Sequence, residues 1–399
     1  MNQIAIEIIN KMKNNIVFKL LKRLVFTQKS IKISPIDGFP YTSGNGIKIA
    51  HVSAYNYGNM GDTYLPVILK NLINNSIPVQ KWYDIFVQDK VTPSIVRKIN
   101  KCDLMIIGGG GLFLSDTHPN NVSGWQWNCD ITMLKEIKTP IVMFAVGYNR
   151  FRGQEDFKPI FTEHLNRFVE QADFVGLRNH GSIERVKGYL KDNRLLDKVE
   201  FQPCMTTLTS LIYSSLLDYS HKENVIALNC AFDRSERRQL GNDLLLKLAS
   251  VAKELSKIAK IKIFAHMKTD LQICPYLDSV GLDYETIIFN DVRQMLGEYS
   301  KASLVIGMRG HAQMIPFGCN TPILSIISHD KMKWFLNDIH HPEWGVDVLD
   351  PNFEDELLKK AKYIYENKDQ IIEEIITEQK SLYNVTSNNL YKIRKILNK

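Results

Sequence analysis

Short runs of apolar residues recur along most of the chain, and each run ends in glycine or a polar residue. Such runs are typical of buried strands, and here they alternate with segments whose apolar residues recur at helical spacing. The alternation predicts parallel sheets and therefore an α/β protein. The predicted strands cover 47–52, a stretch near Ile85, 104–107, 141–146, 174–177, 199–202, 225–229, 261–265, 286–289, 304–306 and 322–327.

The predicted strands form two groups, separated by a stretch rich in serine, threonine and leucine. A chain of 399 residues is long enough for two domains. The expected division is a basic amphipathic helix and connector at 1–46, a first α/β domain at 47–205, a linker at 206–223, a second α/β domain at 224–352 and a helical segment at 353–399.

Residues 4–26 have apolar positions at helical spacing and lysine or arginine on the other faces. A basic amphipathic helix of this kind can lie on an anionic membrane surface. It can equally pack against its own domain and keep the basic face in water. The sequence leaves both interpretations open.

Composition narrows the class of partner. The formal net charge is +7 and the pI is about 8.9, which suits an anionic substrate or membrane surface and is too mild to indicate nucleic acid. Six scattered cysteines form no CxxC pair, so we expect reduced thiols and no zinc or other metal site. With no secretory signal and no apolar run of membrane-spanning length, a cytoplasmic protein is expected, either free or peripheral at the inner face of the membrane.

The second group of strands places charged residues at two strand ends. Arg309, Gly310 and His311 follow the run at 304–306, and Lys331 follows the run at 322–327. Ligands of open parallel sheets bind at this edge. An arginine fork suits phosphate or carboxylate, histidine can carry a proton near neutral pH, and glycine lets the backbone approach a ligand. For each residue alone, a helix cap or a hydrogen-bonded core histidine is the simpler interpretation; together they indicate a site.

The first group of strands ends in loops that could meet the same ligand. Asn59, Gly61 and Asp62 follow the first strand, Gly109 and Gly110 lie within a run of four glycines, Tyr148 and Asn149 follow the strand at 141–146, and Arg178 stands after the strand at 174–177. A glycine-containing loop before a helix offers N–H groups to an anion or a sugar. The alternative is a plain turn in which Asp62 caps the helix. The segment 117–130, with Trp125 and Trp127, is either a sugar-facing loop or a folded aromatic cover.

In the order and spacing of these motifs, the chain resembles the polysaccharide pyruvyl transferase family. The likeness rests on Gly58-Asn59-Met60-Gly61-Asp62, the glycines at 108–111, Arg178 with Ser182, Arg309-Gly310-His311, and Gly318–Pro322 with Asp330-Lys331. It covers about 47–336. It implies a GT-B-like fold, in which two Rossmann-like domains with parallel sheets face an interdomain cleft, the first on the acceptor side and the second on the donor side.

The resemblance also implies a reaction. Members of the family move an enolpyruvyl-derived group from phosphoenolpyruvate to a sugar and form a pyruvate ketal without a metal or nucleotide cofactor, as in exopolysaccharide synthesis. Carried over, it makes His311 the general acid and Arg309 and Arg178 the anchors of the donor's phosphate and carboxylate. Gly310 and Lys331 would complete the donor side. The other loop residues would line the acceptor side, and an acceptor carried on undecaprenyl diphosphate would suit the basic helix at 4–26.

The chain departs from the family pattern at three places. Asn179 stands where relatives often have aspartate, the Gly147 loop reads Gly-Tyr-Asn in place of a Gly-x-Gly turn, and Gln202-Pro203 replaces the usual Asp-Pro. Two other functions remain open: a GT-B glycosyltransferase that uses a nucleotide sugar, and a non-catalytic sugar-binding component of polysaccharide assembly. Phosphoenolpyruvate binding distinguishes the three.

Overall fold

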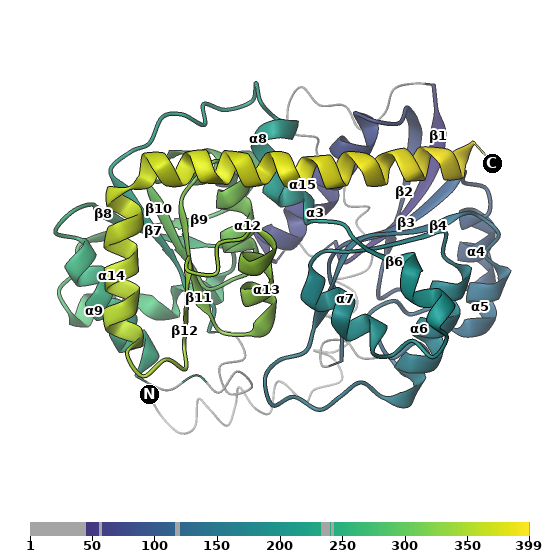
Figure 1. Ribbon diagram of the computed structural model, residues 1–399, viewed down its shortest axis with the longest axis horizontal. Helices are drawn as coiled ribbons and strands as arrows, with labels where there is room; N and C mark the ends of the chain where they lie inside the picture. Colours follow the sequence, from purple (N-terminus) through teal and green to yellow (C-terminus); the bar gives the residue numbers. More distant parts are fainter. Residues whose placement is uncertain (1–44, 56–57, 116–119, 233–239, 241–242, 399) are drawn as a thin grey trace, which may run out of the picture. The chain divides into compact units, whose positions relative to one another are not determined.

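The protein contains two parallel six-stranded sheets, as the computed structural model in Figure 1 shows. The structure describes residues 45–55, 58–115, 120–232, 240 and 243–398, so the predicted helix at 4–26 lies outside the described residues. The strand order is β2-β1-β3-β4-β5-β6 in the first sheet and β12-β11-β10-β7-β8-β9 in the second. Every neighbouring pair is parallel, as the alternation of strands and helices predicts.

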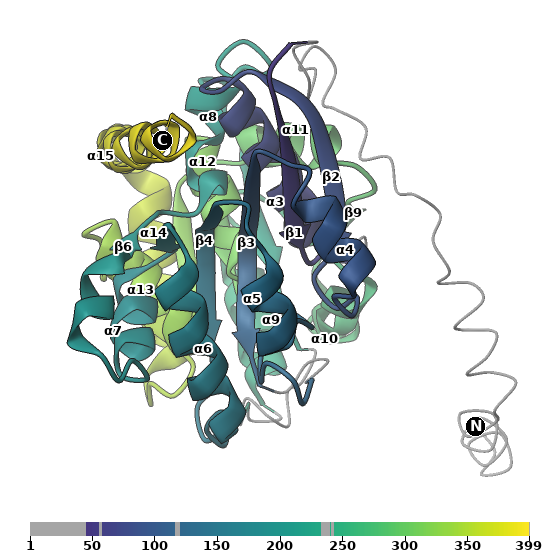
Figure 2. The same ribbon diagram turned by 90° about the vertical axis from the view of Figure 1, so that its right-hand side faces the viewer.

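The first sheet and its connections run from residue 47 to residue 201. In chain order the elements are β1 (Ile47–Ser53), α3 (Met60–Asn74), β2 (Val79–Phe86), α4 (Pro93–Ile99), β3 (Leu104–Leu114), α5 (Ile131–Glu136), β4 (Ile141–Asn149), α6 (Pro159–Gln171), β5 (Phe174–Leu177), α7 (His180–Lys187), the 3-10 turn η1 (Asn193–Lys198) and β6 (Val199–Phe201). Right-handed crossovers place α3 on one face of this sheet and α4 to α7 on the other, which Figure 2 shows from the side.

The second sheet and its helices occupy residues 225–366. The elements are β7 (Val225–Asn229), α9 (Leu244–Leu255), β8 (Lys260–Ala265), the 3-10 turn η4 (Lys268–Ile273), α10 (Cys274–Ser279), β9 (Tyr284–Ile288), α11 (Val292–Lys301), β10 (Leu304–Gly307), α12 (His311–Gly318), β11 (Ile323–Ile327), α13 (Asp330–Asp338), β12 (Gly345–Asp347) and α14 (Phe353–Glu366). By the same crossover rule α11, α12 and α13 share one face, and from that face α11 and α12 contact α3 while α13 contacts α7.

Three segments differ from the sequence-based expectations. The strand predicted at 104–107 continues through the glycine run to Leu114. Glycines fit within this strand because neighbouring atoms leave no room for Cβ atoms there. A Cβ on Gly108 would lie 2.2 Å from the carbonyl oxygen of Phe144 in the next strand. The short edge strand β12 has too few residues to show as an apolar run. The strand expected at 286–289 is β9, which covers Tyr284–Ile288.

The segment between the sheets folds onto α3. It contains the 3-10 turn η2 (Met205–Leu208) and the single-turn helix α8 (Thr209–Ile212). The Oγ1 of Thr209 lies 2.9 Å from the hydroxyl oxygen of Tyr64, and Asn71 donates a 2.8 Å hydrogen bond to the hydroxyl of Tyr213. These buried contacts connect α3 of the first sheet to the chain that leads into the second.

A 30-residue helix, α15 (Lys368–Leu397), passes along both groups of strands (Figure 1). At one place the Nε2 of Gln379 donates to the carbonyl oxygen of Phe317 in α12 at 2.6 Å. Nearer its carboxyl end the Nδ2 of Asn389 donates to the carbonyl oxygen of Phe201 in β6 at 2.8 Å. The helix is therefore bonded to elements of both sheets. None of the helices in the described ranges is long and apolar enough to cross a membrane.

Candidate active site

Both sheets reverse their strand order at a point where charged loops emerge. In the first sheet β1 and β3 are neighbours and their chains continue in opposite directions, and in the second sheet β7 and β10 do the same. Ligands of open α/β sheets bind at the carboxyl ends of the strands beside such a reversal. The loop before α3 leaves one of these points, and Arg309 and His311 leave the other.

The two loops meet at a glycine and a histidine. A Cβ on Gly61 would lie 2.6 Å from both the Cβ and the Nδ1 of His311, so only glycine fits at this position. Beside this contact the backbone N–H of Met60 donates to the carbonyl oxygen of His266 at 3.3 Å. Asn59 caps α3 through a 3.1 Å hydrogen bond from the N–H of Gly61. The interpretation of Asp62 as the cap is wrong, because Asp62 lies within the first turn.

His311 is the first residue of α12, and its ring is not a hydrogen-bonded core histidine. The residue is partly buried, but its Nε2 lies below the surface without a hydrogen-bond partner. Burial of the ring, followed by the charges of Arg178 and Lys331 and by His266, lowers the pKa of His311 well below its usual value. At neutral pH His311 is therefore a neutral imidazole.

Arg178 is a buried cation without a counter-ion. It is 5 % exposed, its Nη2 donates to Oδ1 of Asn149 at 3.0 Å, and its buried Nε has no partner. Within the described ranges it forms no ion pair. The guanidinium packs over Gly147, where a Cβ would lie 2.1 Å from Nε. Burial lowers the pKa of Arg178. Burying a charge without a partner costs on the order of several kcal/mol.

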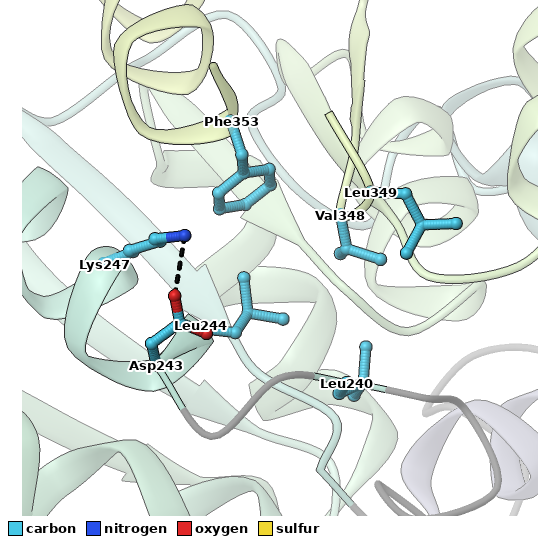
Figure 3. Close-up of a pocket in the computed structure, with 7 residues that line it drawn as sticks. All are labelled: Leu240, Asp243, Leu244, Lys247, Val348, Leu349 and Phe353. Atoms are coloured by element: carbon cyan, nitrogen blue, oxygen red, sulfur yellow. Dashed lines mark ion pairs between the residues drawn. The ribbon is translucent and has the colours of Figure 1, made fainter. Parts of the chain in front are cut away.

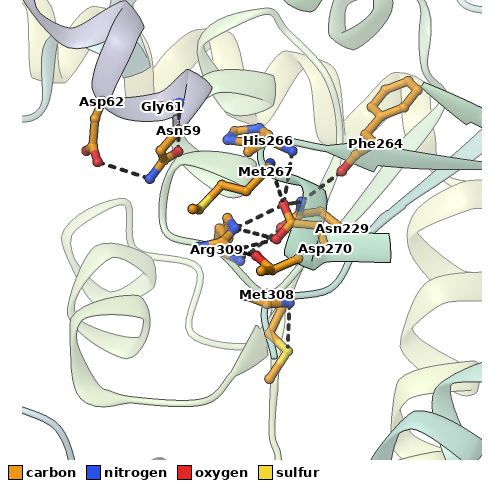
Figure 4. A network of polar contacts seen from close by, with 12 residues as sticks. Asn59, Gly61, Asp62, Asn229, Phe264, His266, Met267, Asp270, Met308 and Arg309 are labelled. Atoms are coloured by element: carbon orange, nitrogen blue, oxygen red, sulfur yellow. Dashed lines mark hydrogen bonds and ion pairs between the residues drawn. The ribbon is translucent and has the colours of Figure 1, made fainter. Parts of the chain in front are cut away.

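Arg309 is held by a carboxylate that the sequence interpretation missed. Asp270, in η4, is fully buried and receives hydrogen bonds from Nε of Arg309 at 2.8 and 3.0 Å and from Nη2 at 2.5 Å (Figure 4). Asp270 also accepts from Nδ2 of Asn229 at 3.1 Å and from the N–H of His266 at 2.9 Å. The network fixes the orientation of Arg309 and balances its charge. A donor-binding role for Arg309 remains a proposal.

Asp62 and Lys331 extend the cluster of charges. Burial raises the pKa of Asp62, and the charges of Lys331, Arg309 and Arg178 and the hydrogen bond from Asn59 oppose the shift. Lys331 lies in the first turn of α13, where its side chain packs on Gly310: a Cβ there would be 3.3 Å from Cε and 3.9 Å from Nζ. All three cations therefore act on one carboxylate, which brings the two halves of the predicted site together.

Some of the residues that were predicted to line the site make no polar contact with the charged cluster around His311. Tyr148 is in the core of the first half, where its ring packs on Phe157 and its hydroxyl lies 3.1 Å from that of Tyr189. Gly109 and Gly110 face the apolar Leu65, so they are close to the loop but offer the described site no polar contact. Asn149 belongs to the site through Arg178.

The sugar-facing interpretation of Trp125 and Trp127 is wrong. Both side chains are fully buried and pack edge-on against Phe168 and His164, and Nε1 of Trp125 donates to Nδ1 of His164 at 3.0 Å. These two indoles instead form part of the hydrophobic core of the first half.

Two of the residues that depart from the family pattern, Asn179 and Gln202, are buried and form hydrogen bonds. Asn179 is fully buried, and its Oδ1 accepts from the N–H of Ser182 at 2.7 Å as the N-cap of α7. Gln202 is fully buried too, and its amide bonds to Thr386 and Asn389 of α15 at 3.2 and 3.1 Å. An aspartate in place of Asn179 would cap α7 equally well. The side-chain amide of Gln202, in contrast, matches the amide and the hydroxyl that α15 presents to it.

A separate pocket lies between α9 and the loop that follows β12 (Figure 3). Leucine, valine and phenylalanine side chains line most of it, together with Asp243 and Lys247, which form an ion pair at 2.7 Å. None of the predicted site residues is among its lining residues. This pocket is therefore distinct from the charged cluster around His311.

The family model for polysaccharide pyruvyl transferases matches residues 15–330 of the chain. The chain belongs to the polysaccharide pyruvyl transferase family. Membership implies a pyruvyl transferase enzyme of polysaccharide biosynthesis, as the sequence motifs indicated. A comparison of the sequence with those of curated proteins found no match.

Solved structures show that this pyruvyl transferase has a GT-B-like fold. The UDP-GlcNAc 2-epimerase of Neisseria meningitidis, bound to UDP-GlcNAc, is 13% identical with a TM-score of 0.51 over 87% of this chain and 100% of its own. An O-GlcNAc transferase mutant of Thermobaculum terrenum is 11% identical with a TM-score of 0.50, over 92% of this chain and 70% of its own. At these identities the likeness concerns the fold alone.

Proposed function

We propose that this protein transfers the enolpyruvyl-derived group of phosphoenolpyruvate to two hydroxyls of one sugar, giving a pyruvate ketal and phosphate. Family membership supports the pyruvyl chemistry. The sugar would belong to a polysaccharide or its lipid-linked precursor. Phosphoenolpyruvate carries a carboxylate and a phosphate, so its site must offer cationic groups and a proton donor in one place.

The observation that carries the proposal is a pair of buried nitrogens, one on Arg178 and one on the neutral ring of His311, that make no hydrogen bond to a described residue. Arg178 has a buried Nε without a partner, and His311 has a buried Nε2 without a partner. An anion bound here would satisfy the arginine with a charge-assisted hydrogen bond. The same anion would raise the pKa of His311, because it offsets the charges of Arg178 and Lys331 that lower it.

His311 is the proposed general acid. As imidazolium it gives its proton to the methylene carbon of phosphoenolpyruvate, and the cation that forms at C2 is captured by the first sugar hydroxyl. The C–O bond to phosphate then breaks, and the second hydroxyl closes the ketal. Of the two hydroxyl protons, one restores His311 and the other leaves with phosphate. Arg178 and Lys331 stabilise the charge on the departing phosphate.

The competing function is transfer from a nucleotide sugar. Its support is the fold, which is similar to that of a UDP-GlcNAc 2-epimerase bound to UDP-GlcNAc and of an O-GlcNAc transferase. The family match favours pyruvyl transfer, and the buried Arg178 favours a small anion that penetrates between the sheets.

A transfer assay with the purified enzyme tests the proposal. Phosphoenolpyruvate is incubated with cell-wall polysaccharide fragments, and the products are analysed by mass spectrometry for the added pyruvate ketal and by colorimetry for phosphate. We expect His311→Ala to abolish both products while its circular dichroism spectrum stays unchanged. A folded His311→Ala enzyme with full activity would contradict the assignment of the general acid.

A further inference from the structure

The long helix α15 divides its charged residues between its two halves. The amino half, residues 368–379, contains four acidic residues and one lysine. The carboxyl half, residues 380–397, contains no acidic residue and four basic ones, which are Lys380, Lys392, Arg394 and Lys395. Figure 2 shows the helix nearly end-on at the edge of the molecule. Its carboxyl half therefore adds a basic strip to the surface.

Most of these positive charges are not balanced by a neighbouring carboxylate. All four basic residues are exposed, and Lys392 pairs with Glu200 of β6. Lys380, Arg394 and Lys395 form no ion pair with a described residue. The helix macrodipole favours cations only in the last turn, so it accounts for Arg394 and Lys395 but not for Lys380. The cations are thus available to an external anionic partner.

Two exposed tyrosines share the face of α15 that carries the unpaired cations. Tyr383 is 42 % exposed and Tyr391 is 57 % exposed, and Nζ of Lys395 lies 4.6 Å from the centroid of the Tyr391 ring. At 3.6 residues per turn, both tyrosines and the three unpaired cations fall within an arc of about 120°. Tyrosine is enriched where a bilayer meets water, and basic side chains there reach the lipid phosphates.

We propose that this face of α15, formed by Lys380, Tyr383, Tyr391, Arg394 and Lys395, binds the surface of an anionic lipid bilayer. Its charge selects an anionic partner, and its length of about 22 Å along one helix suits a flat one. The exposed aromatic rings favour a bilayer over a soluble polyanion, because they gain from the boundary of headgroups and acyl chains. The proposal requires neither the donor nor the acceptor of the proposed function.

The test is co-sedimentation of the full-length protein with vesicles of phosphatidylcholine, with and without phosphatidylglycerol. Arg394→Gln combined with Lys395→Gln should lower the partition coefficient on the anionic vesicles about 10- to 30-fold, since each basic residue at such a surface contributes about fivefold. Tyr391→Ser should lower it several-fold. The segment at 4–26 is present in every variant, so any contribution from it cancels in the comparison.

Two sets of control substitutions match these variants in chemistry. Arg97 and Lys98 of α4 are also an exposed arginine followed by an exposed lysine, and Nζ of Lys98 lies 5.1 Å from the centroid of the Tyr83 ring. Changing both to glutamine removes the same charge and should leave the partition coefficient unchanged. Tyr363 of α14 is 56 % exposed, so Tyr363→Ser is the control for Tyr391→Ser.

Equal losses for the two double variants would reduce the effect to net charge and overturn the proposal. It would also be overturned if the wild type did not sediment with anionic vesicles. A third contrary result is an α15 double variant that loses binding to dextran sulfate, a soluble polyanion, but keeps binding to vesicles. Phosphate release with soluble sugar fragments should be the same in the α15 variants and the wild type, so a failure of the proposed function is seen separately.

Discussion

Single residues at the centre of this protein are costly to stability and useful for binding. Among the described residues, buried Arg178 forms no ion pair and its Nε has no hydrogen-bond partner, and Nε2 of His311 is buried without a hydrogen bond. Replacing such groups by apolar side chains of similar volume is often neutral or stabilising, by about 1–4 kcal/mol for buried ion pairs. Their presence here is explained by the anion that the site is proposed to take.

Gly61 is predicted to control the position of His311. Gly61→Ala would bring a Cβ to 2.6 Å from the imidazole, so the ring or the helix α3 must move. We expect a loss of turnover of about 100-fold, since a misplacement of about 1 Å has this effect in well-oriented sites. The measurement is the steady-state rate of phosphate release from phosphoenolpyruvate in the transfer assay.

Gly297→Ala is the matched control for this substitution. Gly297 lies within α11, and nothing approaches within 4 Å of its added Cβ. Alanine should therefore leave the rate unchanged and stabilise the helix by up to about 1 kcal/mol. Equal rates for the two alanine variants would show that Gly61 does not position His311.

The site residues that could be identified from the sequence follow a local pattern, and those that could not depend on a long-range contact. Arg178, His311 and Lys331 stand at the ends of apolar runs, where the strand pattern alone places them at the binding edge of a sheet. Asp270 stands five residues beyond a predicted strand, inside a 3-10 turn, and its contact with Arg309 joins positions 39 residues apart. Such long-range pairing leaves no local pattern.

Among the elements, α3 is the one that serves both sheets. It contacts β3 in the first half and α11, α12 and η2 on the other side. Its first turn carries Asn59, Gly61 and Asp62 to the second half of the site. The sequence predicted the helix, but the division of its contacts between two sheets depends on the packing of the whole chain.

A second connection between the halves involves the loop after β4. Arg152 donates to both carboxylate oxygens of Asp347, the last residue of β12 in the second sheet, at 2.8 and 2.7 Å and to Asp330 at 3.2 Å. Asp330 begins α13 and directly precedes Lys331. The arginine therefore restrains the turn that presents Lys331 to the site.

Removal of this restraint is expected to weaken donor binding. Arg152→Ala should lower the affinity for phosphoenolpyruvate several-fold, because the first turn of α13 loses its partner and Lys331 becomes less well oriented. Calorimetric titration measures the effect. Arg194→Ala, which removes an exposed arginine paired with Asp192, should change nothing. The same affinity for both variants would exclude an effect of Arg152 on the site.

At the scale of the whole molecule, the hydrophobic pattern predicted the architecture well. Parallel sheets follow from alternating strands and helices, and the sheets lie on either side of the segment at 206–223. The course of β3 through its glycines and the burial of Trp125 and Trp127 were not predictable, because each depends on contacts with elements that are distant in the sequence. The boundaries proposed for the domains remain predictions.

Stability should fall in mild acid because the fold buries neutral histidines. Burial lowers the pKa of His266 to about 3 and that of His164 to about 4, so only the unfolded chain binds their protons as the pH falls below about 6.5. Each contributes a loss of about 1 kcal/mol per pH unit between pH 6 and 5. The raised pKa values of Asp62 and Asp338 act in the opposite direction.

A variant of His164 isolates the contribution of this histidine to the loss of stability in acid. His164 lies in the first core, away from the site, and glutamine can still accept the hydrogen bond from Trp125. Denaturant unfolding of wild type and His164→Gln at several pH values should show a smaller loss of stability in acid for the variant, whatever its stability at pH 7. Parallel curves for the two proteins would mean that His164 does not titrate as described.

The most direct test of the account is a calorimetric titration of phosphoenolpyruvate and of UDP-GlcNAc into wild type and Arg178→Met at pH 7. We predict that the wild type binds phosphoenolpyruvate and not UDP-GlcNAc, and that Arg178→Met loses about 10- to 100-fold in affinity, as expected for one charge-assisted hydrogen bond. Binding of UDP-GlcNAc without phosphoenolpyruvate, or unchanged binding of phosphoenolpyruvate by Arg178→Met, would contradict the proposed donor site.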